Sequence, residues 1–236
     1  MSLKDQEFLY SVFRKEIKDR KIPLSLGKTC PVKCTFCYEM DHSYRKTFET
    51  PLTTQEHWEF IFKEIRSFPT RESESWILGG NEYMEWTDLA LHPKAMDWIE
   101  EFLEKTDKKI TMFSVGYFDP ARINRLAEKY PGRINFELSV ITLGSYREQL
   151  MPKGPSVKQV LAVLDGPAVT SANFYSFGPG SMSEDAKKIS DINKDCLLWM
   201  GCLTPLKYID ADTTKVMRQG KIFLPDEARK IYDMNL

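Results

Sequence analysis

The sequence predicts an α/β fold, built as a partial (β/α)6 barrel with mostly parallel strands. Short apolar segments of strand character alternate along the chain with amphipathic segments of helical period, as in successive βα units. The chain has 236 residues, 42% of them hydrophobic, which is enough for one sizeable core. Since no repeat, low-complexity tract or Pro/Gly/Ser-rich linker separates two halves, we expect a single domain over residues 1–236.

The first half of the chain supplies a leading helix, three strands and three further helices. A charged amphipathic stretch within about 3–20 predicts the leading helix, and the apolar run 22–26 predicts the first strand. Thr53 and Thr54 are suitable N-caps for the helix that follows. The remaining elements are expected as strands over 76–78 and 110–115 and as helices that begin near Pro93 and at Pro120.

The second half continues the same alternation. We expect strands over 134–142, 169–177 and 196–200, with a helix over 156–164 between the first two. Ser183 is the expected N-cap of the helix between the last two strands. The final segment, about 204–236, either closes the open side of the barrel or is a solvated tail.

Three cysteines lie within one short stretch, Cys30-Pro31-Val32-Lys33-Cys34-Thr35-Phe36-Cys37, in the spacing C-x3-C-x2-C. Three thiolates on a 4Fe-4S cluster leave one iron without a protein ligand, and chemistry can occur there. The spacing completes neither a four-cysteine ferredoxin set nor paired zinc knuckles. The alternatives are a zinc site and a loop of incidental buried thiols.

The cysteine motif, with Phe36 before its third cysteine and Tyr38 after it, resembles the signature of the radical S-adenosylmethionine (radical SAM) enzymes. The resemblance implies a TIM-like partial barrel in which Cys30, Cys34 and Cys37 hold a 4Fe-4S cluster. The open iron binds S-adenosyl-L-methionine, and reductive cleavage yields a 5′-deoxyadenosyl radical that abstracts hydrogen from substrate. The subfamily is not identified by these residues.

The resemblance also implies contacts to S-adenosylmethionine at the carboxyl ends of the strands. Gly79-Gly80-Asn81-Glu82 stands where the family has a Gly-Gly-Glu-like element for the ammonium group, although Asn81 separates the glycines from Glu82. Ser139 is the expected ribose contact, and Arg147 is a candidate for the carboxylate, with a solvated surface position as the alternative. Tyr38 and the turn at Gly178 are expected near the adenine ring, and Phe36 flanks the cluster.

Two residues are candidates for the reaction itself. Asn135, Glu137 and Ser139 share one face of their strand by the two-residue period. Because a buried carboxylate needs a partner, Glu137 is a catalytic candidate if that face lines a barrel, whereas a solvated edge strand is the alternative. Cys202 is a candidate for a thiyl or acid role at the barrel mouth, although both Cys202 and Cys196 are expected mainly as small buried hydrophobic residues.

Composition limits the partners and the compartment. A formal net charge of −1 offers no broad attraction to nucleic acid or to an anionic membrane, and no apolar run is long enough to span a bilayer. We therefore expect a cytoplasmic protein. The resemblance implies that it is an enzyme that needs an electron donor such as a flavodoxin or ferredoxin, and we expect its substrate to be a small molecule or a presented peptide. An iron-sulfur carrier or redox sensor that uses the same three cysteines is the non-enzymatic alternative.

Overall fold

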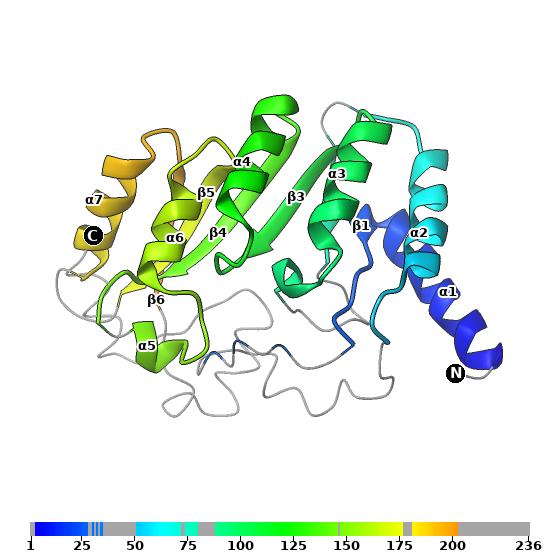
Figure 1. Cartoon of the computed structure of the whole chain (residues 1–236), viewed down its shortest axis with the longest axis horizontal. Helices are drawn as coiled ribbons and strands as arrows, with labels where there is room; N and C mark the ends of the chain where they lie inside the picture. Colours follow the sequence, from blue (N-terminus) through cyan, green and yellow to red (C-terminus); the bar gives the residue numbers. More distant parts are fainter. Residues whose placement is uncertain are drawn as a thin grey trace.

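The computed structural model describes residues 3–27, 30, 32, 34, 51–71, 74–79, 88–145, 147–176 and 181–202. Within these ranges only the main chain is described for residues 149, 175, 176, 181–183 and 199–202. The described strands form one six-stranded sheet in the order β1-β2-β3-β4-β5-β6, and every neighbouring pair is parallel. The predicted α/β architecture with parallel strands in sequence order is confirmed, and Figure 1 shows the sheet behind its helices.

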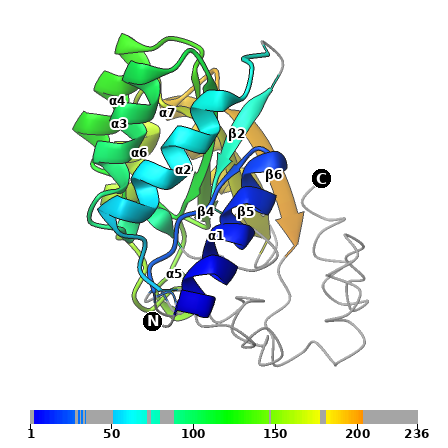
Figure 2. The ribbon, with the colours of Figure 1, turned by 90° about the vertical axis from the view of Figure 1, so that its right-hand side faces the viewer.

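The strands are β1 (Lys21–Ile22), β2 (Ser75–Leu78), β3 (Lys109–Ser114), β4 (Ile134–Ile141), β5 (Val169–Ser176) and β6 (Leu197–Cys202). The helices are α1 (Leu3–Lys18), α2 (Gln55–Ser67), α3 (Ala95–Lys105), α4 (Pro120–Lys129), α5 (Arg147–Leu150), α6 (Val157–Leu164) and α7 (Ser181–Ile192), with a 3-10 turn, η3, at Leu89–Leu91. Helices α2, α3, α4, α6 and α7 lie on one side of the sheet (Figures 1 and 2).

Local sequence signals explain where several helices begin. Thr54 caps α2, because its hydroxyl accepts a hydrogen bond from the main-chain N–H of His57 and the ring of His57 accepts one from the N–H of Thr54. Asp119 caps α4 through the N–H of Ala121, with Pro120 at the first helical position. These are the starts that the sequence predicts for the two helices.

Some element boundaries differ from the prediction. Strand β1 ends at Ile22 although the apolar run continues to Leu26, since Pro23 has no N–H to donate to a ladder. Helix α7 begins at Ser181, so the prediction that Ser183 is its N-cap is wrong: Ser183 lies inside the helix. The sequence predicts neither α5 nor η3, because each is too short to show a helical period.

The core lies between the sheet and the helices that cover it. Phe136, Leu138 and Val140 of β4 are buried on this side, in agreement with the two-residue period. Strand β4 pairs with β3 and with β5, so the edge-strand alternative for β4 is wrong. Among the helices that the structure describes, none is both long and apolar enough to cross a bilayer.

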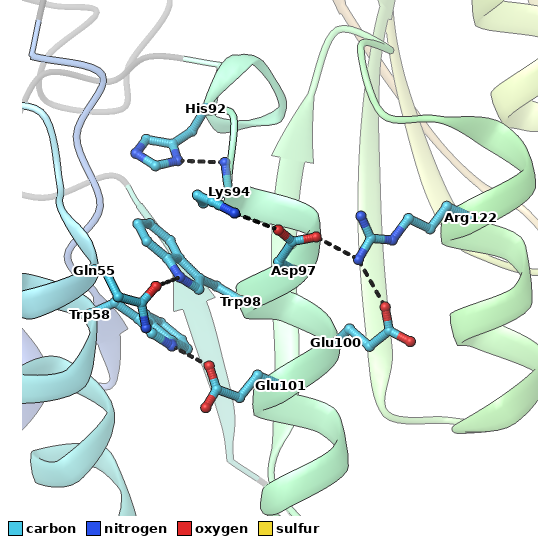
Figure 3. Close-up of polar contacts among 9 residues, drawn as sticks. All are labelled: Gln55, Trp58, His92, Lys94, Asp97, Trp98, Glu100, Glu101 and Arg122. Atoms are coloured by element: carbon cyan, nitrogen blue, oxygen red, sulfur yellow. Dashed lines mark hydrogen bonds and ion pairs between the residues drawn. The ribbon is translucent and has the colours of Figure 1, made fainter.

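Helices α2 and α3 pack through two stacked tryptophans. The rings of Trp58 and Trp98 lie 5.3 Å apart at an interplanar angle of 12°, and both side chains are almost fully buried. Figure 3 shows that each indole N–H has an acceptor: Trp58 donates to Glu101 at 2.7 Å and Trp98 donates to Gln55 at 3.1 Å. The two helices are therefore joined by both apolar area and satisfied polar atoms.

Substitution of Trp98 by alanine tests this contact. We expect Trp98→Ala to lower the free energy of unfolding by about 3–5 kcal/mol, because it leaves a cavity against Trp58. Phe8→Ala is the control, since Phe8 is 46% exposed and its loss should cost less than about 1 kcal/mol. Urea denaturation measures both values, and equal losses in the two variants would contradict the packing described.

Candidate functional site

The cysteine segment packs against the carboxyl edge of the sheet. Cys30 and Cys34 follow β1 and are partly exposed, whereas Val32 between them is 2% exposed. A small apolar cluster, separate from the main core, joins the cysteine segment to the segments that follow β3 and β4. Its buried members are Val32, Ile141, Leu150 and Met151, and the residues packed against them are Cys30, Cys34, Leu91, Val115 and Tyr117. We call this set the cysteine-loop cluster.

The two ends of the segment that carries the cysteines meet at its base. The N–H of Thr53 donates to the carbonyl of Ser25 at 3.1 Å, and the N–H of Ser25 donates to the hydroxyl of Thr53 at 2.8 Å. Gly27 has a φ of +63°, and a Cβ there would lie 2.3 Å from the main-chain nitrogen of Leu52. Only glycine fits this close approach without moving the backbone. The sequence therefore fixes where the cysteine segment leaves the core and returns to it.

The end of β4 turns sharply at a strained isoleucine. Ile141 has a φ of +67°, which is rare for a β-branched residue, and the N–H of Thr142 donates to the carbonyl of Val140 at 2.8 Å across it. The Ile141 side chain is 4% exposed and belongs to the cysteine-loop cluster. Strain of this kind persists only where surrounding contacts impose it.

Arg147, at the start of α5, supplies such contacts. Its Nη1 donates to the carbonyls of Val140 and Thr142, the latter at 3.1 Å, so it binds on both sides of Ile141. Its Nε donates to the carbonyl of Pro155 at 3.1 Å. Arg147 is 3% exposed, so the alternative of a solvated surface position is wrong.

The Arg147 guanidinium also has a buried nitrogen to spare. Nη2 is buried and has no hydrogen-bond partner among the residues that the structure describes. Burial lowers the pKa of Arg147, and negative charge at Cys34, Asp185 and Tyr117 acts in the opposite direction. A buried cationic donor without an acceptor is costly, and an anionic group bound beside Cys34 would satisfy it.

A buried carboxylate holds the segment that follows β3. Asp88 accepts hydrogen bonds from the Ser114 hydroxyl at 2.9 Å, the N–H of Val115 at 2.8 Å and the N–H of Ala90 at 3.1 Å. Burial raises the pKa of Asp88 to about 6, and the three hydrogen bonds only partly oppose this shift. Burial also raises the pKa of Tyr117, with smaller contributions from Asp88, Cys30 and Cys34. The phenol therefore lies within electrostatic reach of the carboxylate and of both thiols.

The face of β4 that points away from the helices is polar, as predicted. Glu137 is partly buried and accepts a hydrogen bond from Asn173 of β5. Ser139 is on the same face and is paired in register with Asn173. Glu137 and Ser139 therefore lie two residues apart along β4, on the face of the sheet that points away from the helices.

Gly79 ends β2 in a conformation that favours glycine. Its φ is +74°, its N–H donates to the carbonyl of Ile22 at 3.0 Å, and a Cβ would lie 2.3 Å from Cδ1 of Leu89. Gly79 therefore stands at the carboxyl edge, as predicted, where its lack of a side chain has a packing reason.

Other predicted site residues lie outside the described part of the chain. They are Phe36, Cys37, Tyr38, Gly80, Asn81, Glu82 and Gly178. For Cys202 only the main chain is described: it ends β6, paired in register with Ser176. Cys196 is buried at the opposite, amino end of β6, and burial raises its thiol pKa to about 11. Cys196 is thus a buried small residue, as predicted, and lies at the opposite end of the sheet from Cys30 and Cys34.

The described residues fit a group that is anionic and bound through sulfur. Cys30 and Cys34 offer two thiol donors in an apolar setting, and Arg147, within electrostatic reach of Cys34, offers a cationic nitrogen without a partner among the described residues. No three His, Cys, Asp or Glu side chains within the described residues gather as a metal site. Cys37, the third member of the predicted set, lies outside those residues.

Asp88, Asp185 and Tyr117 were not predicted from the sequence. Asp88 accepts a hydrogen bond from the hydroxyl of Ser114, which ends β3, and Asp185 accepts one from the hydroxyl of Thr142, which follows β4. An apolar residue and a glycine follow each hydroxyl residue, in Ser114-Val115-Gly116 and Thr142-Leu143-Gly144, and Ser25-Leu26-Gly27 has the same pattern. The recurrence of this pattern at the ends of predicted strands was the available signal. No comparable pattern marks Tyr117.

Replacement of Gly79 by alanine is expected to be more damaging than the same change at Gly132. Both glycines have positive φ, +74° and +70°, but a Cβ at Gly132 meets nothing within 4 Å. Both variants incur about 1–2 kcal/mol of left-handed strain, and only Gly79→Ala also displaces Leu89. Urea denaturation should show the larger loss of stability for Gly79→Ala, and equal losses would contradict the close approach.

The stability of the protein should depend on the ionisation of Asp88. Because burial raises the folded-state pKa from 3.8 to about 6, the folded state binds this proton more tightly than the unfolded state does. The wild-type free energy of unfolding, relative to that of Asp88→Asn, should therefore fall as pH rises from about 4 to about 6, by up to roughly 3 kcal/mol. Urea denaturation at stepped pH measures the difference, and a constant difference across this window would contradict the burial.

Comparison with known proteins supports the fold. No family profile and no curated protein matches the chain. Among solved structures, it is similar to Streptococcus suis SuiB, crystallised bound to the precursor peptide SuiA, with a TM-score of 0.54 and 15% sequence identity. The match covers 93% of this chain and 48% of the SuiB chain, so this chain spans about half the length of that protein. The two proteins share the α/β architecture of parallel strands.

Proposed function

We propose that the protein is a radical SAM enzyme that cleaves S-adenosylmethionine reductively. The observation that carries the proposal is the cysteine-loop cluster, which holds two thiols of the C-x3-C-x2-C motif, together with a buried guanidinium that has a spare donor and lies within electrostatic reach of Cys34. The cluster stands at the carboxyl edge of a parallel sheet, where ligands bind in α/β folds. The likeness to SuiB supports the α/β fold that the proposal requires.

The roles of the residues follow from their places. Cys30, Cys34 and Cys37 would hold a 4Fe-4S cluster, which supplies the electron that cleaves S-adenosylmethionine to a 5′-deoxyadenosyl radical. Arg147 would use Nη2 to bind the carboxylate of S-adenosylmethionine, with its other nitrogens fixed on main-chain carbonyls. Gly79 permits close approach of main chain to the ligand. The apolar packing around the thiols would shield them in part from water.

The polar face beside the site would receive the substrate. Glu137, oriented by Asn173, offers a carboxylate oxygen to a donor group of the substrate, and Ser139 lies nearer the carboxyl edge for the ribose. Cys202, at the carboxyl end of β6, would act late in the reaction as a hydrogen or proton donor. SuiB was crystallised with a precursor peptide, which favours a peptide over a small molecule as substrate class.

The protein would act in the cytoplasm with a flavodoxin or ferredoxin as its electron donor. An iron-sulfur carrier or redox sensor is the second candidate function, because it needs the thiols alone. It gives no use to the spare nitrogen of Arg147 or to the polar face of β4. Binding and cleavage of S-adenosylmethionine therefore separate the two candidates.

Substitution of one cluster cysteine tests the proposed function. After anaerobic reconstitution we expect about four irons per chain, and dithionite with S-adenosylmethionine should release 5′-deoxyadenosine. Cys34→Ala should lose both the full iron content and the release, because it removes one thiolate ligand. Cys196→Ser is the matched control and should retain both, since Cys196 is buried at the other end of the sheet.

The same experiment distinguishes the alternatives. A loaded cluster with no binding or cleavage of S-adenosylmethionine would favour the carrier, and zinc in a colourless protein would exclude both candidates. If Cys196→Ser lost the cluster while Cys34→Ala kept it, the assignment of the ligand set would be wrong.

A further inference from the structure

The same side-chain hydrogen bond recurs at or just beyond the carboxyl ends of β1, β3 and β4, and we call it the hydroxyl–glycine device. At Ser25, Ser114 and Thr142 the side-chain hydroxyl accepts the N–H of the glycine two residues later, in each case at 3.0 Å. The device satisfies an N–H group that the end of a parallel strand would otherwise leave without a partner. It also directs the following segment across the carboxyl edge of the sheet.

At two of these strand ends a buried aspartate completes the device. Asp88, before η3, accepts from the hydroxyl of Ser114 and the N–H of Val115 at the end of β3. Asp185, from α7, accepts from the hydroxyl of Thr142 at 2.7 Å and the N–H of Leu143 at 3.1 Å, beyond the end of β4. In each case one Oδ2 atom receives both hydrogen bonds, from a hydroxyl and from the next main-chain N–H.

Burial of the two carboxylates costs free energy. Asp88 is 8% exposed and Asp185 is 2% exposed, and burial raises the pKa of both. The hydrogen-bond donors that the structure describes around them are neutral. A carboxylate placed in this way limits the strand end to one arrangement, because any shift leaves a buried charge without its hydrogen bonds.

Both strand ends lead directly into the cysteine-loop cluster. Beyond the Asp88 contacts, Val115 and Tyr117 pack against the buried members of the cysteine-loop cluster, which include Val32 of the cysteine segment. The N–H of Tyr117 is also held by the Ser114 hydroxyl, at 3.3 Å. Asp88 thus holds Ser114, and the two residues that pack on the cluster follow at Val115 and Tyr117.

The end of β4 contributes a different residue, Ile141, to the cysteine-loop cluster. Thr142, whose hydroxyl is held by Asp185, follows the strained Ile141, which belongs with Val32 to the buried part of the cysteine-loop cluster. Arg147 binds the Thr142 carbonyl and the Val140 carbonyl, so the turn at Ile141 is fixed from both sides. Two separate carboxylates, from different parts of the chain, therefore set the surface on which the cysteine segment rests.

We propose that Asp88 and Asp185 are positioning residues, which hold the ends of β3 and β4 in the arrangement that seats the cysteine segment. They contact neither the thiols nor the ligand in this assignment and act through Val115, Tyr117 and Ile141. This position of the cysteine segment is a property of the metal-free chain. Only its effect on a bound 4Fe-4S cluster rests on the proposed function.

Hydrogen exchange of the metal-free protein, followed by mass spectrometry, tests the proposal. In Asp88→Asn, amide exchange should accelerate about tenfold both in the segment 114–117 and in the segment 30–34, while α6 keeps its protection. Asp185→Asn should accelerate the segments 141–144 and 30–34 in the same way. Asp119→Asn is the matched control: its N-cap role in α4 suits asparagine equally, so 30–34 should not change.

A milder variant covers the case in which Asp88→Asn unfolds. Ser114→Ala removes one donor to Asp88 and the acceptor for the N–H groups of Gly116 and Tyr117, and it should accelerate 30–34 by a smaller factor. Ser114→Thr keeps the hydroxyl and should restore slow exchange. Acceleration at the strand ends with no change in 30–34, in any of these variants, would overturn the proposal.

Iron loss from the reconstituted protein then tests whether the position of the cysteine segment stabilises the bound 4Fe-4S cluster. Asp88→Asn and Asp185→Asn should lose iron to a chelator about tenfold faster than the wild type or Asp119→Asn does. If the wild-type protein takes up no iron, the proposed function fails, but the exchange experiment still decides the positioning proposal. If exchange in 30–34 changed while the rate of iron loss did not, both aspartates would position the cysteine segment in the metal-free chain alone. Their proposed effect on the bound 4Fe-4S cluster would then be overturned.

Discussion

Parallel pairing of the strands in sequence order is the constraint on which the rest of the structure depends. It places the carboxyl ends of all six described strands along one edge, so segments far apart in the sequence meet there. The cysteines follow β1, Asp88 and Tyr117 lie on either side of β3, and Ile141 ends β4. A change in strand order would separate these residues while leaving each local motif intact.

Polar atoms at this edge are satisfied mainly by side chains. Because the strands of a parallel sheet stop together, their terminal N–H and C=O groups need partners in the loops. Hydroxyls, two carboxylates and one guanidinium supply them at β1, β3 and β4. Arg147 has one buried nitrogen more than these contacts use, and its guanidinium lies within electrostatic reach of Cys34. Most polar atoms described at this edge are therefore hydrogen-bonded, whereas the Nη2 donor of Arg147 has no acceptor among the described residues.

The sequence predicted those features that depend on short-range patterns. Alternation along β4 placed Glu137 and Ser139 on the polar face, and Thr54 and Pro120 marked the starts of two helices. Features that depend on long-range contacts were not predictable. Arg147 is buried against the carbonyls of Val140, Thr142 and Pro155. Asp88 caps η3 through the N–H of Ala90, but its other partners, Ser114 and Val115, lie far along the chain at the end of β3. The early end of β1 is different, because Pro23 is a local signal within the apolar run.

The contact between Gly27 and Leu52 has a consequence for the length of the cysteine segment. Its two ends are held together by the Ser25–Thr53 hydrogen bonds, independently of what lies between them. The entropy of closing a chain grows only with the logarithm of its length, so doubling the number of residues between fixed ends costs about 0.6 kcal/mol. The contacts that close the segment at Ser25, Gly27, Leu52 and Thr53 should therefore persist if residues, such as a binding epitope or a label, are added between them.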